Sequence, residues 1–447
     1  MASRLPRRAA SAFGLLMIGN LHAAIPAMPR LNAGLQTYGS PASGLPTLVD
    51  GKYKTASWSI SAGSWAAWKL PSAPGKVALA WNNPSYTWSD WVTNASNCKQ
   101  GANLTFPADY EILTSSNSTD GTDGDWTSRL KVTGNKVSSR MHIVQTGADV
   151  WVKMAIQAGT GSLDEIEIHD ASVSTEDTWA FIGTSITSGA FKSDFPAVGD
   201  FQSWMSQSSA NGNWPLVVRA GIPCIVSTDV SSNIGRYLEM LDGVKNWAIE
   251  MGTNDAWGGG TGNVASFKAA MQLVIDSAKG RGVRVFLART PATNSTLTDG
   301  KWQVNPAFLT AIDDLVRTNG LVEGADLNAY FTKYPSDLSS DGVHPNAKGY
   351  AAIHNQWANA LLLRSVYAPM SSVDKIRRGA DLRFVSDRAG TRLRIDGAQG
   401  PLWLVSIDGA KRKIGVDGQG WIPREWGLTG VQFVQTQGQV RAVFVGR

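Results

Sequence analysis

Five short apolar runs alternate with helical patterns in the middle of the chain, and this alternation restricts the possible folds more than any other feature. The runs cover residues 178–182, 215–219, 246–251, 283–288 and 321–327. Runs of this length without a polar face are typical of parallel strands buried on both sides. The segment Val264 to Lys279 places apolar residues on one face of a helix, namely Phe267, Met271, Val274, Ile275 and Ala278. We therefore predict a doubly wound, flavodoxin-like α/β/α sandwich over residues 177–367.

A serine follows the first of these runs. The stretch Phe181-Ile-Gly-Thr-Ser-Ile-Thr187 breaks the strand at Gly183 and puts Ser185 where a helix should begin. In α/β sheets, ligands bind at this carboxyl end of the strands. A serine there can act as a nucleophile beside backbone N–H groups that stabilise an oxyanion. A structural turn has the same pattern, so this stretch alone leaves both interpretations open.

Three later stretches also lie at the ends of predicted strands or helices. They are Arg219-Ala-Gly-Ile-Pro223, Glu250-Met-Gly-Thr-Asn-Asp255 and Asp341-Gly-Val-His-Pro345. With Ser185 they supply Ser, Gly, Asn and His in that order. The pattern resembles the SGNH (GDSL-like) hydrolase superfamily over about residues 177–365. The family usually has Gly-Asp-Ser in the first block, where this chain has Gly183-Thr184-Ser185. That departure affects the bracing of the loop more than the nucleophile.

Only one of the five histidines is well placed as a general base. The others lie in the N-terminal leader, in predicted β-structure or inside a helical pattern, namely His22, His142, His169 and His354. His344 lies on a loop between Gly and Pro positions. Asp341 can accept a hydrogen bond from its Nδ1 while Nε2 faces Ser185. We therefore predict that Ser185, His344 and Asp341 are catalytic, with capping of the next helix as the alternative role for Asp341.

The resemblance also implies an oxyanion hole. Its donors are the N–H of Ser185, the N–H of Gly221 and the side chain of Asn254. We expect a side chain at position 221 to block the approach of the substrate carbonyl. The neighbouring Asp255 is expected to brace the loop. The sequence contains no metal-ligand cluster, phosphate-binding glycine loop or nucleotide motif, so no cofactor is expected.

Residues 31–175 have the pattern of short strands separated by turns. Apolar and polar residues alternate clearly in Val150 to Ile156, which predicts a β-sandwich. The order of Leu48-Val-Asp-Gly51, Tyr110 to Ser115 and Leu163 to Ile168 resembles a discoidin-type, galactose-binding-like domain. Such domains bind sugars or only pack against a catalytic neighbour, and both roles stay open.

Tryptophan is abundant in a chain with few charges. There are 18 Trp, and charged residues make up only 17% of the sequence. Most tryptophans are expected in hydrophobic cores. Trp88 and Trp91 lie in the polar loop Asn82 to Gln100. We predict that these two residues, together with Trp257, contact a sugar substrate, with core packing as the alternative.

Residues 375–447 return to a strand pattern, with Asp-Gly turns that suggest hairpins. We predict a small all-β domain after a linker at Ala368 to Gly379. The central domain is therefore expected to have all-β domains before and after it. Residues 371–447 contain 13 Lys and Arg against 7 Asp and Glu. A solvated surface is the favoured interpretation of this excess, and attraction of an anionic polysaccharide is the alternative.

Residues 1–24 have the pattern of a signal peptide. Three arginines precede a short apolar region at Ala9 to Leu21, and Ala23-Ala24 supplies small residues for cleavage. The apolar region is too short for a membrane span. We predict export to the periplasm or the medium by the general route rather than the twin-arginine route. Cleavage reduces the formal net charge from +5 to +2, which gives no argument for binding nucleic acid or membranes.

Two features stay open at this point. Cys98 and Cys224 can form a disulfide after export, or both can be free buried thiols. The acidic stretch Asp120 to Asp125 offers oxygen ligands for calcium, but it lacks the 12-residue loop pattern with a closing Glu. A solvated turn is the favoured interpretation.

These observations predict an exported serine esterase flanked by β-domains. The resembled family includes lipases, arylesterases, thioesterases and carbohydrate O-deacetylases. The aromatic-rich N-terminal part favours an acetylated polysaccharide or oligosaccharide as substrate, with no nucleic acid and no membrane insertion. The alternatives are a general short-chain carboxylesterase or lipase-like enzyme, and a carbohydrate-binding protein with an inactive hydrolase domain. The oligomeric state is not predicted.

Overall fold

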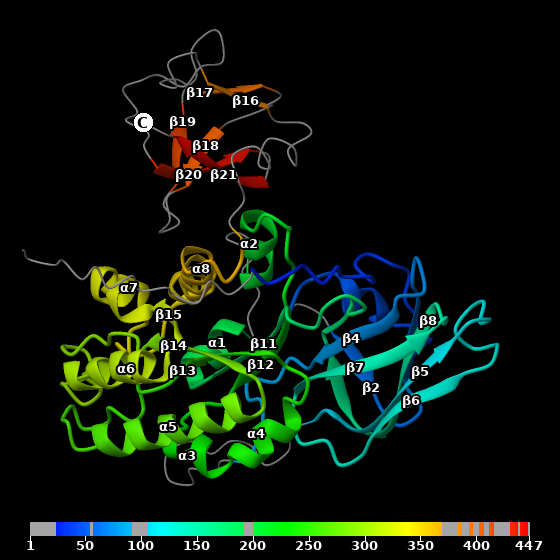
Figure 1. The fold of residues 1–447 in the computed structure, drawn as a ribbon, viewed down its shortest axis with the longest axis horizontal. Coiled ribbons are helices and arrows are strands. Elements are labelled where there is room, and N and C mark those ends of the chain that lie inside the picture. Colours follow the sequence, from blue (N-terminus) through cyan, green and yellow to red (C-terminus); the bar gives the residue numbers. More distant parts are fainter. Residues whose placement is uncertain are drawn as a thin grey trace, which may run out of the picture.

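The computed structural model describes residues 24–53, 57–91, 105–191 and 200–368, together with the backbone of six C-terminal strands (Figure 1). A parallel sheet covered by helices occupies the middle of the chain, and antiparallel sheets precede and follow it. Among the helices of these described residues, none is long and apolar enough to cross a membrane.

The parallel sheet has the strand order β12-β11-β13-β14-β15. Its strands are β11 (Thr178–Gly183), β12 (Leu216–Gly221), β13 (Asn246–Glu250), β14 (Arg284–Arg289) and β15 (Val322–Asp326). Every pairing is parallel, which confirms the predicted sheet. After β11, the chain adds β12 on one side of that strand and then adds β13, β14 and β15 in turn on the other side. The strand order therefore switches direction beside β11, and ligands bind at the carboxyl ends of the strands near such a point.

Helices cover both faces of this sheet (Figure 1). One face packs against α1 (Ser185–Phe191), α2 (Phe201–Ser208), α7 (Leu327–Lys333) and α8 (Ala347–Leu363). The other packs against α3 (Ser227–Ser232), α4 (Ile234–Met240), α5 (Val264–Gly280) and α6 (Pro306–Asn319). Alternate residues of β11 serve the two cores, because successive strand side chains point to opposite faces. Trp179 and Phe181 lie in the first core, and Ala180 and Ile182 in the second.

The N-terminal part consists of antiparallel sheets. A five-stranded sheet has the order β1-β3-β8-β5-β6, a three-stranded sheet has the order β10-β4-β7, and β2 pairs with β9. The strands are β1 (Tyr38–Ser40), β2 (Trp58–Ile60), β3 (Trp65–Lys69), β4 (Gly75–Asn82), β5 (Pro107–Ser115), β6 (Thr127–Val132), β7 (Ser139–Gly147), β8 (Trp151–Gly159), β9 (Gly161–Leu163) and β10 (Glu165–Asp170), with a 3-10 helix η1 (Leu45–Val49) after β1. The predicted strand pattern is present. The galactose-binding-like resemblance stays a prediction.

Strand β4 is buried on both faces. Val77, Leu79 and Trp81 pack in the core of the N-terminal sheets. Ala78 and Ala80 point the other way, into the core that also contains α4 and α5. The three-stranded sheet therefore lies between its own partner sheet and the α/β part (Figure 1). This explains why β4 lacks the polar alternation expected of a strand with one solvated face.

A buried polar network strengthens this contact. Glu167 on β10 accepts hydrogen bonds from Gln202 Nε2 of α2 at 3.0 Å and from Trp214 Nε1 at 2.9 Å. Arg30 forms a 3.2 Å ion pair with the same carboxylate. From β12, Arg219 donates to Gln202 Oε1 at 3.2 Å. Because unpaired buried charges are costly, these partners favour one fixed arrangement of the two parts.

The C-terminal strands are β16 (Arg383–Ser386), β17 (Leu393–Asp396), β18 (Leu402–Val405), β19 (Lys411–Ile414), β20 (Gly430–Thr436) and β21 (Gln439–Val445). β16 pairs with β17, and the others form a sheet of order β19-β18-β20-β21. All these pairings are antiparallel, in agreement with the predicted strands. Residues 1–23 and Cys98 lie outside the described residues, so the signal peptide and the disulfide stay predictions.

The acidic stretch Asp120 to Asp125 forms a turn held by its own hydrogen bonds. The Asp123 carboxylate accepts from Ser118 Oγ at 2.9 Å and from Thr119 N and Oγ1 at 2.6 Å. These hydrogen bonds within the turn explain the presence of Asp123 without a bound calcium ion. Within the described ranges, no group of three or more His, Cys, Asp or Glu side chains is arranged to hold a metal ion.

Candidate active site

Ser185 lies at the junction of β11 and α1. The strand ends at Gly183, and α1 begins at Ser185 itself. A Cβ at Gly183 would lie 2.2 Å from Thr187 Oγ1 and 2.6 Å from the Glu250 carbonyl oxygen. Only glycine permits this tight turn. Within Phe181 to Phe191, Ser185 is the one residue that is not buried. Its N–H belongs to the first helical turn, where backbone donors have no partner inside the helix.

His344 and Asp341 lie beside this serine. His344 Nε2 is 2.8 Å from Ser185 Oγ, and His344 Nδ1 is 2.6 Å from an Asp341 carboxylate oxygen. The other Asp341 oxygen accepts from the backbone N–H of Val343 and of His344, at 2.8 and 2.9 Å. Partial burial raises the pKa of Asp341, but the hydrogen bonds from His344 and the backbone outweigh it and hold that pKa well below its usual range. The carboxylate is therefore ionised and orients the imidazole, as the predicted geometry requires.

The three other histidines of the described residues are structural. His142 bonds Tyr110 through Nε2 at 2.6 Å, and His354 bonds the Ala190 carbonyl at 2.8 Å. Burial lowers the pKa of His142 to about 3 and the pKa of His169 and His354 to about 4. These rings stay neutral inside the cores at pH 7. Their burial agrees with the choice of His344 by elimination.

Thr184 is braced by a residue that the sequence pattern did not reveal. Its hydroxyl donates to Glu250 Oε2 at 3.1 Å and accepts from the Ile186 N–H at 3.2 Å. Thr187 Oγ1 donates to the same Glu250 oxygen at 3.0 Å. Burial raises the pKa of Glu250, while the hydrogen bonds from Thr187 and Thr184 act in the opposite direction. A carboxyl from the end of β13 thus braces the serine turn in a chain that lacks the usual Asp.

Restoring the family's Asp should therefore harm this protein. Thr184→Asp places a second carboxyl against buried Glu250, and two neighbouring carboxylates cannot both ionise cheaply. We expect the free energy of unfolding at pH 7 to fall by about 2 kcal/mol or more, measured by urea denaturation. The matched control is Thr184→Asp combined with Glu250→Gln, whose amide can donate to the new carboxylate and should recover part of the loss. Wild-type stability in the single variant would contradict the described contact.

The structure shows a reason for glycine at position 221 that differs from the one we predict from the sequence. A Cβ at this position would lie 2.4 Å from Ser188 N and 2.6 Å from Ser188 Cα. Glycine is therefore needed for the close approach of β12 to α1. This reason is independent of any substrate, and the expectation that a side chain at position 221 would block the substrate carbonyl stays a prediction. The role of the Gly221 N–H as an oxyanion donor stays a prediction.

Asn254 follows β13 at the same end of the sheet. Its Nδ2 donates to the Ile225 carbonyl at 2.9 Å, which fixes the orientation of the amide and leaves its second N–H for another acceptor. The next residue, Asp255, accepts from Ser227 N at 3.0 Å and from Ser227 Oγ at 2.5 Å. Asp255 thus ties the loop to the start of α3, in agreement with the predicted bracing role.

Comparisons with known proteins bear on this arrangement. Residues 181–352 match the GDSL-like Lipase/Acylhydrolase family. The chain contains a GDSL-like lipase/acylhydrolase domain. A lipase/acylhydrolase from Enterococcus faecalis is 20% identical with a TM-score of 0.35, and the match covers 43% of this chain and 98% of that one. Axe2, an acetylxylan esterase from Geobacillus stearothermophilus, is 18% identical with a TM-score of 0.34, covering 44% and 96%. No curated protein sequence matches the chain significantly.

The prediction that Trp88 stacks on a sugar is wrong. Trp88 is 0% exposed and packs in a core shared with the hydrolase domain, against Tyr237 at 5.2 Å between ring centroids. Its backbone N–H donates to the Gly221 carbonyl at 2.9 Å, and its indole Nε1 donates to the Ser139 carbonyl at 2.8 Å. Trp91 is partly buried beside the same two rings, 5.4 Å from Trp88. The polar sequence around them predicts an exposed loop, but contact with Tyr237 of α4 buries Trp88 and partly buries Trp91. Both tryptophans join the N-terminal sheets to the hydrolase domain.

Trp257 is exposed, as a substrate contact requires. It keeps 52% of its surface accessible and lies three residues after Asn254 on the same loop. Its ring packs edge-on against Trp302, with centroids 4.2 Å apart. Contact of Trp257 with a substrate stays a prediction.

Tyr86 was missed in the sequence. It comes from the N-terminal part, yet its hydroxyl donates to the Ser185 carbonyl at 2.9 Å. The residue stands two positions before Trp88 in the same polar loop. The one signal of this residue in the sequence is that it is aromatic and lies in the same polar loop as Trp88 and Trp91.

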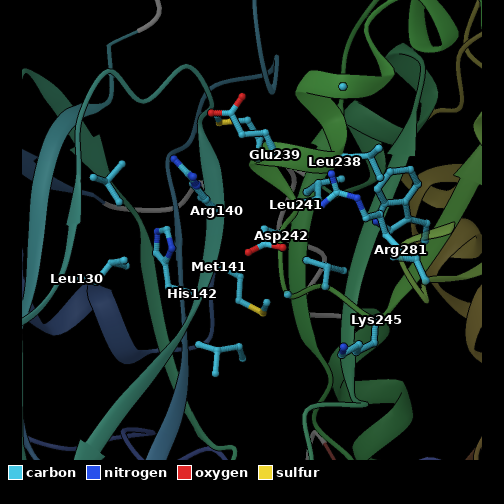
Figure 2. Close-up of a pocket in the computed structure, with 18 of the residues that line it drawn as sticks. Leu130, Arg140, Met141, His142, Leu238, Glu239, Leu241, Asp242, Lys245 and Arg281 are labelled. Atoms are coloured by element: carbon cyan, nitrogen blue, oxygen red, sulfur yellow. The ribbon is translucent and has the colours of Figure 1, made fainter. Parts of the chain in front are cut away.

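A cavity of about 970 Å³ lies between the N-terminal sheets and the hydrolase domain. In Figure 2, Arg140 and His142 of β7 line one wall, and Asp242, Lys245 and Arg281 lie toward the other. Lys245 and Val283, which precede β13 and β14, place it at the amino ends of the strands, away from Ser185. Its cations and acids are mixed, so it indicates no single class of ligand.

Proposed function

We propose that this protein is an exported serine esterase that removes O-acetyl groups from a polysaccharide or oligosaccharide. Ser185 is its nucleophile, His344 its general base and Asp341 the residue that orients the base. The observation that carries the proposal is the continuous hydrogen-bonded series from Ser185 Oγ to His344, at 2.8 Å, and from His344 to Asp341, at 2.6 Å. A serine activated by a histidine that a carboxylate orients is the arrangement needed for acyl transfer.

The reaction proceeds in two half-reactions. Ser185 Oγ attacks the acetyl carbonyl carbon while His344 Nε2 takes the hydroxyl proton. His344 then gives that proton to the sugar oxygen as its bond to the acetyl carbon breaks, which leaves an acetyl-serine. Water attacks this ester with His344 again as base, and acetate and free Ser185 are released. Asp341 stabilises the imidazolium in each half-reaction.

The negative charge on the carbonyl oxygen needs donors that are already in position. In the proposal these are the N–H of Ser185, the second N–H of Asn254 and, by resemblance to the family, the N–H of Gly221. The hydrogen bond from Asn254 to Ile225 supports this role, because an amide already oriented loses little freedom when the charge develops.

Two observations favour this function over its alternatives. The bracing of Thr184 by Glu250 replaces the missing Asp of the signature, which favours turnover over an inactive, sugar-binding hydrolase domain. Two exposed aromatic residues, Tyr86 in contact with Ser185 and Trp257 on the loop of Asn254, favour a carbohydrate over a simple short-chain ester. Export rests on the signal-peptide pattern of residues 1–24, which favours an extracellular or periplasmic polysaccharide as substrate.

Acetate release distinguishes these functions. Purified protein is incubated with acetylated xylan, acetylated pectin, an acetylated bacterial exopolysaccharide and p-nitrophenyl acetate, alongside Ser185→Ala as control. We expect release from at least one polysaccharide, and none with the variant. Hydrolysis of p-nitrophenyl acetate alone would instead indicate a general carboxylesterase. Polysaccharide binding without any hydrolysis would indicate an inactive hydrolase domain.

A further inference from the structure

We propose that Tyr86, from the loop that follows β4 in the N-terminal part, forms one wall of the substrate-binding site at Ser185 and selects for a carbohydrate substrate. The inference rests on the proposed esterase function and adds a specificity-determining residue to it. In this view the N-terminal part completes the active site. It is not an independent sugar-binding module.

The first observation is the contact between Tyr86 and the first turn of α1. The Tyr86 hydroxyl donates to the Ser185 carbonyl at 2.9 Å, and Ser188 Oγ donates to the Tyr86 carbonyl. The side chain and the backbone of Tyr86 therefore both bind the helix that begins with the nucleophile. Among the hydrogen bonds of the described residues, no other one joins the N-terminal part to Ser185 itself.

The second observation is that a residue of α8 fixes the Tyr86 ring. The side chains of Tyr350 and Tyr86 are joined by a hydrogen bond. A Cβ at Gly189 would lie 2.3 Å from the Tyr350 ring, so glycine at that position of α1 lets Tyr350 pack closely. The Tyr86 ring is therefore held in one position by its contacts with Tyr350 and Ser185, and Gly189 leaves room for Tyr350. A side chain that is already fixed loses little conformational freedom when a ligand binds.

The loop that carries Tyr86 is itself well anchored. Trp88 N donates to the Gly221 carbonyl at 2.9 Å, and Ser138 Oγ donates to the Thr87 carbonyl at 2.8 Å. On the other side, Asn83 Oδ1 accepts from Ser85 N at 2.8 Å. These bonds tie the loop both to the hydrolase domain and to the N-terminal sheets. The ring position thus depends on the fixed arrangement of the two parts.

The third observation is the exposure of apolar surface around the catalytic groups. Tyr86 keeps 40% of its surface accessible, and Trp257 and Leu297 each keep 52%. Trp257 belongs to the loop of Asn254, and Leu297 packs beside Gly342 in the loop of Asp341 and His344. Three exposed apolar side chains therefore lie on, or pack against, three segments of the proposed site: the Ser185 turn, the Asn254 loop and the loop of Asp341 and His344. Exposed apolar groups that gather in this way mark a ligand-binding surface.

The chemistry of the wall suits a sugar ring. The C–H groups on one face of a pyranose pack on an aromatic ring, while its hydroxyls stay in water at the edges. Tyrosine supplies such a flat apolar body with a polar tip. A lipid chain would require a long, closed apolar channel, whereas Tyr86 and Trp257 are both open to solvent. The geometry therefore points to a sugar that carries the acetyl group, seated against Tyr86.

The test compares two acetyl esters in three variants. The substrates are an acetylated xylo-oligosaccharide and ethyl acetate, which has no ring to stack, both followed by acetate release. Tyr86→Ala should lower the ratio of their kcat/KM values, oligosaccharide over ethyl acetate, by about tenfold. Tyr86→Phe keeps the ring and should leave this ratio within about twofold of wild type, whatever it does to both rates together. Trp126→Ala, at the residue directly before β6 of the five-stranded outer sheet, is the matched control and should change neither rate.

A binding measurement separates this inference from the proposed function. In a Ser185→Ala background, Tyr86→Ala should weaken calorimetric binding of the acetylated xylo-oligosaccharide by about tenfold. An unchanged ratio and unchanged affinity in folded Tyr86→Ala protein would overturn the role of Tyr86. So would an equal loss in Trp126→Ala, since that result assigns binding to the outer sheet. A third outcome is that the wild-type protein hydrolyses no ester, while Tyr86→Ala still weakens binding of the oligosaccharide. That outcome would contradict only the proposed esterase function.

Discussion

Replacing His344 with alanine should lower kcat on p-nitrophenyl acetate by at least about 10³-fold, because the proton of Ser185 then has no acceptor. The His344 side chain is 39% exposed, so its truncation leaves no buried cavity and the variant should fold normally. Stopped-flow or steady-state kinetics give kcat, and circular dichroism gives the folding control. A loss below tenfold in folded protein would contradict the assignment of the base.

The second large effect concerns Asn254. Its free amide N–H should bind the carbonyl oxygen mainly when negative charge develops there, so the interaction is stronger in the transition state than with bound substrate. Asn254→Ala should lower kcat by about 10²–10³-fold, or roughly 3–4 kcal/mol, with KM little changed. Asn254→Asp turns an acceptor toward the Ile225 carbonyl and the oxyanion, so it should be at least as damaging.

The control for this experiment is the neighbouring residue. Asp255 accepts hydrogen bonds from Ser227 and makes no contact with Ser185 or His344 among those described. Asp255→Asn should therefore reduce the melting temperature more than kcat. A simple binding role for Asn254 predicts the opposite kinetic pattern, in which KM rises and kcat stays. Measuring both constants for Asn254→Ala decides between the two roles.

The parallel sheet and the hydrogen-bonded series Ser185–His344–Asp341 could be predicted because their signals are local. Each strand is a short apolar run, and each site residue follows such a run or precedes a helix. Ser185 and His344 therefore meet at the carboxyl end of the sheet, and Asn254 follows β13 at the same end. The Asp341 role followed from a spacing of three residues on a single turn.

The contacts of the N-terminal part could not be predicted, because they depend on how two separately folded layers meet. Trp88 lies in a polar stretch that favours an exposed loop, yet the facing helix α4 buries it completely. Tyr86 lies 99 positions from Ser185 in sequence. The spacing of apolar residues predicts contacts within a helix or strand, and it cannot predict a contact between residues so far apart. Gly221 was recognised, but the helix backbone that requires it became visible only in three dimensions.

The role of Glu250 could not be predicted from the sequence either, although Glu250 and Thr184 belong to the same domain. The sequence shows that the usual Asp is missing at position 184. Only the three-dimensional structure shows that a carboxyl group from β13, the neighbouring strand in the sheet, forms hydrogen bonds with this turn instead. Sequence patterns of this kind record which residue stands at a position. They do not record which neighbour has taken over its hydrogen bonds.

Covalent labelling tests the central claim, that Ser185 is an activated nucleophile, most directly. The protein is treated with an organophosphonate ester, which reacts with serines activated by a neighbouring base. Peptide mass spectrometry then locates the adduct. We expect one phosphonyl group per chain, on the peptide containing Ser185, with parallel loss of acetate release and no labelling of Ser185→Ala or His344→Ala. Full esterase activity without modification of Ser185, or labelling at another serine that tracks the loss of activity, would contradict it.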